Sequence, residues 1–292
     1  MRRDARMQDE DQRYGYTAVG HVTADVMEDG SRRPGGTAFY AALQAARLGV
    51  RTLIITRGVP REIEGLLEPH RHELDLRVIA AQETTTLATS GTGTERTQRV
   101  LAWAGAFEGE LALCTRIAHI APVAREGPHR LGGSAQFLGL TPQGMVRRWD
   151  AAQAPITLEP ACPGGRRARL AGISDAIVVS EHEVHSCGSL IAAARAGGAV
   201  VAVTHGPRPT TLLHADGTQS ALEVAPLREA RDDLGAGDVF AAAFFLALQE
   251  GRGDTGSALY ANAAAAVRMM GTGARAIGDA TAIEKRLAET GG

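Results

Sequence analysis

Short apolar runs rich in β-branched residues alternate with alanine-rich and amphipathic segments along most of the chain. The short runs predict strands at residues 16–21, 51–56, 76–79, 117–123, 135–140, 156–158, 176–180 and 199–204. The intervening and following segments predict helices at residues 37–48, 63–74, 145–149, 239–245 and 258–270. Strands that alternate with helices indicate an α/β chain, in which ligands collect beyond the carboxyl ends of the strands.

Two stretches depart from this alternation. Residues 84–101 are rich in threonine and carry glycines between two extended arms, which predicts a β-hairpin. Residues 211–214 and 220–224 are separated by the turn signal Ala215-Asp216-Gly217 and predict a second hairpin. The chain therefore carries two predicted hairpins beside its alternating strands and helices.

The stretch from Asp232 to Asp238 joins a tight loop to an apolar helix. A helix start has free N–H groups and the positive end of the dipole, so the amides of Gly235, Ala236 and Gly237 are candidate ligands for a phosphate. Asp238 falls in the first helical turn. It is either a helix-capping carboxylate, which is common at such positions, or a base that takes a proton from a hydroxyl attacking phosphorus.

Charge and lysine content exclude several classes of function. The 292 residues include 31 basic and 33 acidic side chains and carry a net charge of -2, which gives no sign of a nucleic-acid partner. Lys285 is the only lysine, whereas a P-loop and a protein-kinase site each need one near the phosphates. A dinucleotide-binding motif is also excluded, because Phe240 stands where its third glycine or alanine belongs.

Cysteine usage and hydropathy indicate a reduced, cytoplasmic setting. No apolar run has the length of a membrane span, and no metal-binding spacing is seen among the three cysteines, Cys114, Cys162 and Cys187. Residues 1–13 are charged throughout and are predicted to form a disordered N-terminal extension rather than a targeting signal. His182 and His185 lie near acidic residues but lack a third ligand at a suitable spacing, so they are expected to be surface histidines.

Two glycine-containing motifs carry a family resemblance. The motif Asp232-x-x-Gly-Ala-Gly-Asp238, followed by an alanine-rich helix, resembles the second signature of the ribokinase-like (PfkB) family of carbohydrate kinases. The glycine pair and helix at residues 35–49 resemble the first signature, and weaker matches extend the resemblance over residues 16–280. The turn at residues 141–144, Thr-Pro-Gln-Gly, resembles the corresponding turn in the inositol-kinase-like branch of this family.

The resemblance implies a fold with two parts. The main part is a three-layer α/β/α sandwich within a single kinase domain at residues 14–292. A small β-sheet lid, formed by residues 22–34 and 83–104, would close over the acceptor. Lid strands of such kinases pair between subunits, so the resemblance also implies a homodimer.

The activity implied is transfer of the γ-phosphate of ATP to a hydroxyl of a small sugar or cyclitol such as myo-inositol. Asp238 would be the catalytic base, and the amides of Gly235, Ala236 and Gly237 would stabilise charge on the phosphoryl group. Asp25, beyond the first strand, either accepts hydrogen bonds from acceptor hydroxyls or is a solvated loop residue. The other predicted acceptor contacts are Gly35, Gly36, Tyr40, Gln98, Arg99 and Gln143.

On the donor side the resemblance implies Mg²⁺ with ATP. It also implies a monovalent cation, K⁺, near the loop at residues 232–238, which we call the anion loop. The predicted donor contacts are Ser180, Glu183, Thr204, Gly206 and Asn262. Glu183 is expected to organise Mg²⁺ through water, and Asn262 has a packing role as its alternative. Ser180 and Tyr40 each replace an asparagine of the family pattern, and Asp233 replaces threonine or proline. The extra carboxylate of Asp233 leaves K⁺ activation open.

Two other functions stay open beside the sugar or cyclitol kinase. One is a nucleoside kinase of the same fold, and the other is a catalytically weak regulator that binds a sugar or a nucleotide. The retained Asp238 favours a kinase. The departures at Tyr40, Ser180 and Asp233 keep the regulator open as an alternative.

Overall fold

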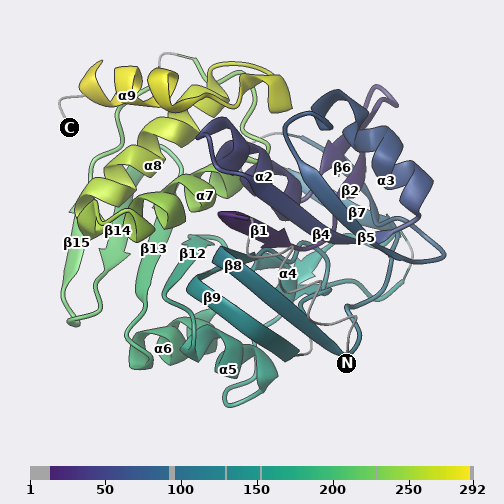
Figure 1. Ribbon diagram of the computed structural model, residues 1–292, viewed down its shortest axis with the longest axis horizontal. Coiled ribbons are helices and arrows are strands. Elements are labelled where there is room, and N and C mark those ends of the chain that lie inside the picture. Colours follow the sequence, from purple (N-terminus) through teal and green to yellow (C-terminus); the bar gives the residue numbers. More distant parts are fainter. Residues whose placement is uncertain (1–13, 92–95, 129, 152, 228, 290–292) are drawn as a thin grey trace.

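A nine-stranded sheet forms the centre of the computed structural model, which describes residues 14–91, 96–128, 130–151, 153–227 and 229–289 (Figure 1). The predicted disordered extension at residues 1–13 lies outside the described residues. The strands in order across the sheet are β15 (Gln219–Leu222), β14 (Arg208–Leu213), β13 (Val200–His205), β12 (Ala176–Ser180), β9 (Arg130–Leu140), β8 (Glu110–Ile120), β1 (Tyr16–Val19), β4 (Thr52–Gly58) and β5 (Asp75–Ala80).

Parallel pairing brings the ends of the central strands to one edge. The strands from β13 to β5 pair in parallel, whereas β14 and β15 form the second predicted hairpin and add antiparallel strands. Val19 at the end of β1 lies opposite Ile55 and Ile120, and Ser180 at the end of β12 lies opposite Thr204. The segments predicted to hold the site therefore leave the sheet at the same edge.

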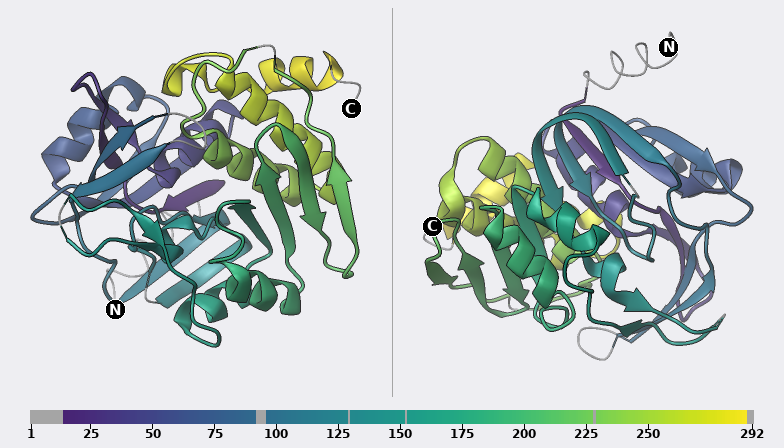
Figure 2. Two further views of the ribbon diagram at one scale, coloured as in Figure 1. Left: turned by 180° about the vertical axis from the view of Figure 1, so that it is seen from behind. Right: turned by 90° about the horizontal axis from the view of Figure 1, so that it is seen from below.

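Helices cover both faces of this sheet, as Figures 1 and 2 show. One face carries α2 (Thr37–Arg47), α7 (Ala236–Gln249) and α8 (Gly253–Met269), with α9 (Ala280–Glu289) packed on α8. The other face carries α5 (Arg166–Gly172) and α6 (Gly188–Ala196). Each layer has its own apolar core, so the predicted three-layer sandwich is confirmed. Among the described helices, none is long and apolar enough to cross a membrane.

Helix α7 lies between the sheet and its neighbouring helices. Its residues from Val239 to Ala247 are all buried, because the run is apolar on every side rather than on one stripe. Phe245 contacts the ring of His119 on β8 with 5.0 Å between centroids. The start of α7 is consequently fixed by packing along most of the helix.

A smaller sheet stands beside the sandwich at the end away from α9, with α3 (Pro60–Leu67) close by (Figures 1 and 2). Its strands in order are β3 (Arg32–Gly35), β2 (Thr23–Val26), β6 (Thr86–Ser90) and β7 (Thr97–Ala102). Strands β6 and β7 pair antiparallel, which confirms the threonine-rich hairpin, although residues 92–95 at its tip lie outside the described residues. The role of this sheet as a lid stays a prediction.

Several predicted boundaries were wrong for local reasons. The helix expected at residues 63–74 begins at Pro60, ends at Leu67 and continues as a 3₁₀ turn at Glu68–His70, because Pro69 disfavours α-helix before it. The helix expected at 145–149 is instead α4 (Gln143–Val146), followed by β10 (Arg147–Arg148), which pairs with β11 (Thr157–Leu158).

Candidate active site

The loop before α7 turns sharply at Gly235, the residue that caps this helix. Its φ of 81° and ψ of 2° lie in the left-handed region, and a Cβ on Gly235 would approach Cδ1 of Tyr40 to 2.4 Å. Both constraints call for glycine. The Tyr40 ring, which is 4 % exposed, thus packs against Gly235 of this loop. Its predicted contact with the acceptor stays a proposal.

Three N–H groups are free at the start of α7. Within the described chain, the N–H groups of Gly235, Gly237 and Asp238 have no backbone acceptor. The N–H of Ala236, by contrast, donates to the carbonyl oxygen of Asp233 at 3.1 Å. The prediction that the Ala236 amide serves an anion is therefore corrected, because the turn already uses this donor. The remaining N–H groups and the dipole still favour negative charge here.

Asp238 lies half-buried beside these N–H groups. The hydroxyl of Thr37, the first residue of α2, lies near its carboxylate and favours its ionised form. Burial raises the pKa of Asp238 to about 6, while the Thr37 hydroxyl and the charge of Arg147 oppose this rise. An acid with a pKa just below neutrality is ionised at pH 7 and still binds a proton readily, which suits a general base.

A second buried carboxylate belongs to Asp25 on β2, which is 2 % exposed. Its Oδ1 accepts a hydrogen bond of 2.7 Å from the Thr23 hydroxyl. Burial raises the pKa of Asp25 to about 6, against the lowering effect of Thr23 and of the nearby charge of Arg147. The charge of Asp25 in turn contributes to the raised pKa of Asp238. The structure therefore brings together the two carboxylates predicted to face the acceptor.

Gly35 and Gly36 keep this region open to Asp25. A Cβ on Gly35 would lie 2.1 Å from Oδ2 of Asp25, so no other residue fits against the carboxylate. Gly36 caps α2 and leads directly to Thr37, which contacts Asp238. The glycine pair thus connects the two carboxylates through the start of one helix.

Arg147 on β10 is the site residue that sequence reasoning missed. Its Nη2 donates to Oε1 of Gln98 and to Oε1 of Gln143, each at 2.9 Å, and its Nη1 donates to the carbonyl oxygen of Val123 at 2.9 Å. Nε2 of Gln143 donates to Oγ1 of Thr37 at 2.9 Å. A continuous chain of hydrogen bonds therefore joins Thr37, beside Asp238, through Gln143 and Arg147 to Gln98 of the small sheet.

Gln98 and Arg99, the two predicted acceptor contacts on β7, point to opposite faces of the small sheet. Gln98 faces this chain of hydrogen bonds and also donates from Nε2 to Oγ1 of Thr89 at 3.1 Å. Arg99 is exposed, because successive residues of a strand point to opposite faces. The structure brings Gln98 and Gln143 to the site and leaves Arg99 outside it.

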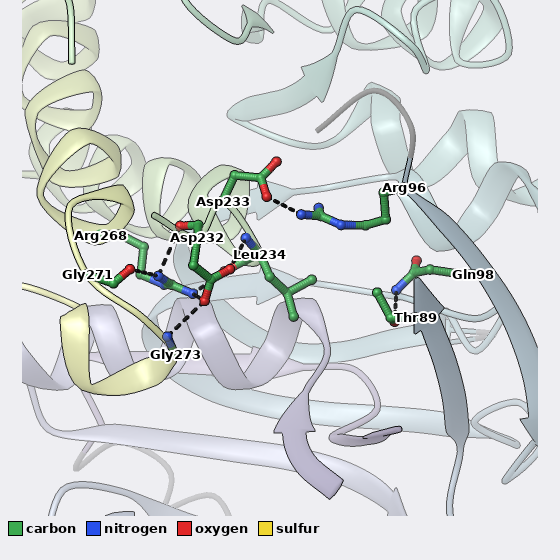
Figure 3. A network of polar contacts seen from close by, with 9 residues as sticks. All are labelled: Thr89, Arg96, Gln98, Asp232, Asp233, Leu234, Arg268, Gly271 and Gly273. Carbon is green, nitrogen blue, oxygen red and sulfur yellow. Dashed lines mark hydrogen bonds and ion pairs between the residues drawn. The ribbon is translucent and has the colours of Figure 1, made fainter. Parts of the chain in front are cut away.

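The extra carboxylate of Asp233 pairs with an arginine of the small sheet. Arg96, just before β7, forms an ion pair and hydrogen bond with Asp233 (Figure 3). Their side chains are 22 % and 32 % exposed, so the pair is partly shielded from solvent. The hairpin is consequently tied to the anion loop, and the negative charge of Asp233 is neutralised locally.

Four of the predicted donor contacts lie at the ends of the neighbouring strands β12 and β13, and the fifth lies on α8. Ser180 donates its N–H to Oε2 of Glu183 at 2.9 Å, and Thr204 lies beside Ser180 on β13. Gly206, with a φ of 62°, turns the chain from β13 into β14. Asn262 on α8 is further along, where its Oδ1 accepts a hydrogen bond of 3.0 Å from Thr210. Its Nδ2 is buried without a partner among the described residues.

The fit to Mg²⁺ rests on one carboxylate. Among the described residues, no three His, Cys, Asp or Glu side chains converge on a metal position, and His182 is largely exposed as expected. One oxygen of Glu183 is used by the Ser180 N–H, and the charge of Glu183 acts on Arg147 and Asp238. Mg²⁺ is commonly held by one or two carboxylates, waters and substrate phosphates, and Glu183 fits such a water-mediated role.

The two raised pKa values lead to a pH prediction. Asp238 can take a proton only when ionised, and Asp25 offers both oxygens as hydrogen-bond acceptors only when ionised, so activity is expected to rise with pH through about 6. Since both carboxyls titrate there, kcat/KM should fall below pH 6 more steeply than about tenfold per pH unit. A pH–rate profile in constant-ionic-strength buffers measures this. A rate that is constant between pH 5 and pH 8 would contradict it.

One part of the chain matches a known protein family. Residues 166–280, which include the anion loop, match the family described as pfkB family carbohydrate kinase. No curated protein matches the chain.

Solved structures share the fold along nearly the whole chain. A pyrophosphate-dependent kinase in the ribokinase family, complexed with a pyrophosphate analog and myo-inositol, is 21% identical with a TM-score of 0.66, over 87% of this chain and 94% of that chain. Arabidopsis thaliana ribokinase, complexed with ribose and ATP, is 17% identical with a TM-score of 0.70, over 94% and 98%. A fructokinase double mutant from Vibrio cholerae, bound to fructose, ADP and potassium ion, is 17% identical with a TM-score of 0.67, over 94% and 98%. These similarities show that the chain as a whole has the ribokinase-family fold.

Proposed function

We propose that the protein is a kinase that transfers the γ-phosphate of ATP to a hydroxyl of a small sugar or cyclitol. The observation that carries this proposal is the start of α7, where the half-buried Asp238 lies beside N–H groups that have no backbone acceptor in the described chain. A carboxylate beside an anion site would repel a phosphate unless it serves a reaction. Accepting the proton of an attacking hydroxyl is the reaction that suits it.

The acceptor is held by Asp25, whose carboxylate accepts hydrogen bonds from its hydroxyls, and by Gln98 and Gln143 around Arg147. Asp238 takes the proton of one hydroxyl as that oxygen forms a bond to the γ-phosphorus. The bond from the γ-phosphorus to its bridging oxygen breaks, and ADP leaves with the electron pair. Asp238 then returns the proton to solvent.

Charge on the transferring phosphoryl group is stabilised by the N–H groups of Gly235, Gly237 and Asp238. Glu183 would hold Mg²⁺ through water, and the ion would supply charge neutralisation for the donor phosphates. Ser180, Thr204, Gly206 and Asn262 contact the nucleotide. Placement and electrostatics of this kind account for most of the catalysis in phosphoryl transfer.

A substrate panel tests the proposal. With ATP and Mg²⁺, a coupled ADP-release assay over myo-inositol, fructose, ribose and adenosine is expected to show turnover with a sugar or cyclitol. Turnover with adenosine alone would make the protein a nucleoside kinase. A shift in melting temperature without turnover for any compound would make it a binding regulator and contradict the kinase.

The phosphoryl donor needs a second arm of the same assay. One similar structure is of a pyrophosphate-dependent kinase and another contains ATP, so pyrophosphate and ATP are the two candidate donors. Phosphate release from pyrophosphate, followed with each acceptor, is measured beside ADP release from ATP. We expect the higher kcat/KM with ATP.

A homodimer through the small sheet and a cytoplasmic location stay predictions.

A further inference from the structure

A fully buried arginine lies directly behind the anion loop. Arg268 on α8 has 0 % of its surface exposed, and its guanidinium is 5.7 Å from the centroid of the Tyr40 ring. Figure 3 shows it enclosed by the loop that carries Asp232 and by the turn at Gly271 and Gly273. An arginine is almost never fully buried unless it is paired, so its partners indicate its role.

All the hydrogen bonds of this guanidinium go to oxygens of these two segments. Nη2 donates to Oδ2 of Asp232 at 2.9 Å and to the carbonyl oxygen of Leu234 at 2.6 Å. Nη1 donates to the carbonyl oxygens of Asp232 at 3.3 Å and Gly271 at 3.4 Å. Nε is buried with no partner in the described chain. The hydrogen-bonding end of the side chain therefore sits in a shell of three carbonyls and one carboxylate.

Two backbone N–H groups hold the carboxylate of this shell in place. Oδ1 of Asp232 accepts the N–H of Leu234 at 2.9 Å, and Oδ2 accepts the N–H of Gly273 at 2.8 Å. Burial favours protonation of Asp232, but these N–H groups and Arg268 outweigh it and lower its pKa. Carbonyl and carboxylate oxygens fixed in this way are the ligands that K⁺ takes in place of its hydration shell. The monovalent cation that the family resemblance implies does not fit here, because the guanidinium already uses these oxygens.

We infer that the guanidinium of Arg268 is the built-in cation of the anion loop and that the protein does not use K⁺. The inference rests on the proposed function, since it concerns the loop that holds the transferring phosphoryl group. Asp232 and Asp233 place two negative charges within six residues of Asp238, where they would repel a phosphate. Arg268 neutralises the first and Arg96 the second, so the positive end of α7 is left to act on the anion.

The first test uses the unmodified protein. It is exchanged into choline chloride, and KCl or NaCl is then added at constant ionic strength while turnover and melting temperature are followed. Turnover is expected to change by less than about twofold, with no K⁺-specific rise in melting temperature. A saturable activation of about tenfold or more, or a melting temperature raised by K⁺ and not by Na⁺, would overturn the inference.

The second test removes the guanidinium from the shell of oxygens. Arg268→Ala leaves the oxygens without their cation, so turnover in choline should fall about tenfold or more and the melting temperature should drop. Added K⁺, or a low concentration of guanidinium, should raise both in the variant alone. Wild-type turnover by the variant in choline would contradict a role for this charge.

The matched control is Arg286→Ala. The guanidinium of Arg286 also donates to carbonyl oxygens, those of Ala225 and Pro226, which lie outside the loop at residues 232–238. No ion should restore any property of this variant selectively. If Arg268→Ala does not fold, Arg268→Lys, which retains a charge, is expected to fold and to keep K⁺ independence, and K⁺ dependence of that variant would contradict the inference.

A crystal soaked with Tl⁺ separates this inference from the proposed function, because it needs no turnover. Anomalous density for Tl⁺ within the shell of the unmodified protein would overturn the inference even if the protein is a kinase. An empty anomalous map there, with the guanidinium in place, supports it even if no acceptor in the panel is phosphorylated.

Discussion

Asp238→Asn is expected to lower kcat by about 10³-fold while leaving the affinity for ATP nearly unchanged. The asparagine has the same shape and still lies beside Thr37, but it cannot accept the proton of the acceptor hydroxyl. ADP release measures kcat, and calorimetric titration with ATP measures binding. Turnover within about tenfold of the parent would remove Asp238 from the role of base.

The melting temperature of Asp238→Asn tests separately whether folding raises the pKa of Asp238. Folding raises the pKa of Asp238 from 3.8 to about 6, so the folded state binds the proton more tightly, and this carboxyl lowers stability as pH rises through that interval. Asp238→Asn should therefore melt at or above the parent temperature at pH 7. Glu62→Gln is the matched control, because Glu62 is an exposed acid in the first turn of α3 and should affect neither property.

Arg147→Met is expected to lower kcat/KM at pH 7 by about 10²-fold and to move the acidic limb of the pH profile upward. The guanidinium lowers the pKa of both Asp25 and Asp238, so its loss raises both and leaves less of each carboxylate ionised at pH 7. It also holds Gln98 and Gln143 in place, and their release disturbs the acceptor position.

The control for this variant lies one residue along the chain. Arg148 is exposed and pairs with Asp150 and Glu159 at the surface, so Arg148→Met should leave both the rate and the pH profile unchanged. An Arg147→Met enzyme with the parent pH profile would show that Arg147 does not act on the two carboxyls. A lower rate with an unshifted profile would leave it only a packing role.

The elements of this fold were largely predictable from local pattern. The β-branched run at residues 176–180 matches β12 residue for residue, and the threonine-rich arms around Gly91 form the hairpin of β6 and β7. The anion loop was predictable because glycine and apolar residues follow one another directly in the chain. Asp25 and Asp238 were predicted on the acceptor side from the family resemblance, with Asp25 placed beyond the first strand and Asp238 at the start of a helix, whereas Asp25 lies within β2.

The charges that surround these acids could not be predicted in the same way. Arg147 reaches Gln98 across 49 residues, and Arg96 reaches Asp233 across 137. Such pairs depend on how separate elements are placed in space, which hydrophobic periodicity does not describe. The role of Arg147 was also missed because a helix was expected at residues 145–149. Arg147 lies instead on the two-residue strand β10, which is too short to give a periodic pattern. A departure from the family pattern, at Asp233, was the one local sign of an ion pair.

The most direct test of the central claim is a crystal structure with ADP, aluminium fluoride and an acceptor that the panel identifies. The fluoride group mimics the transferring phosphoryl group, so it is predicted to lie within hydrogen-bond distance of the Gly235 and Gly237 N–H groups. The acceptor hydroxyl should then lie against the carboxylate of Asp238. Fluoride density away from the start of α7, or an acceptor that does not contact Asp238, would contradict the account.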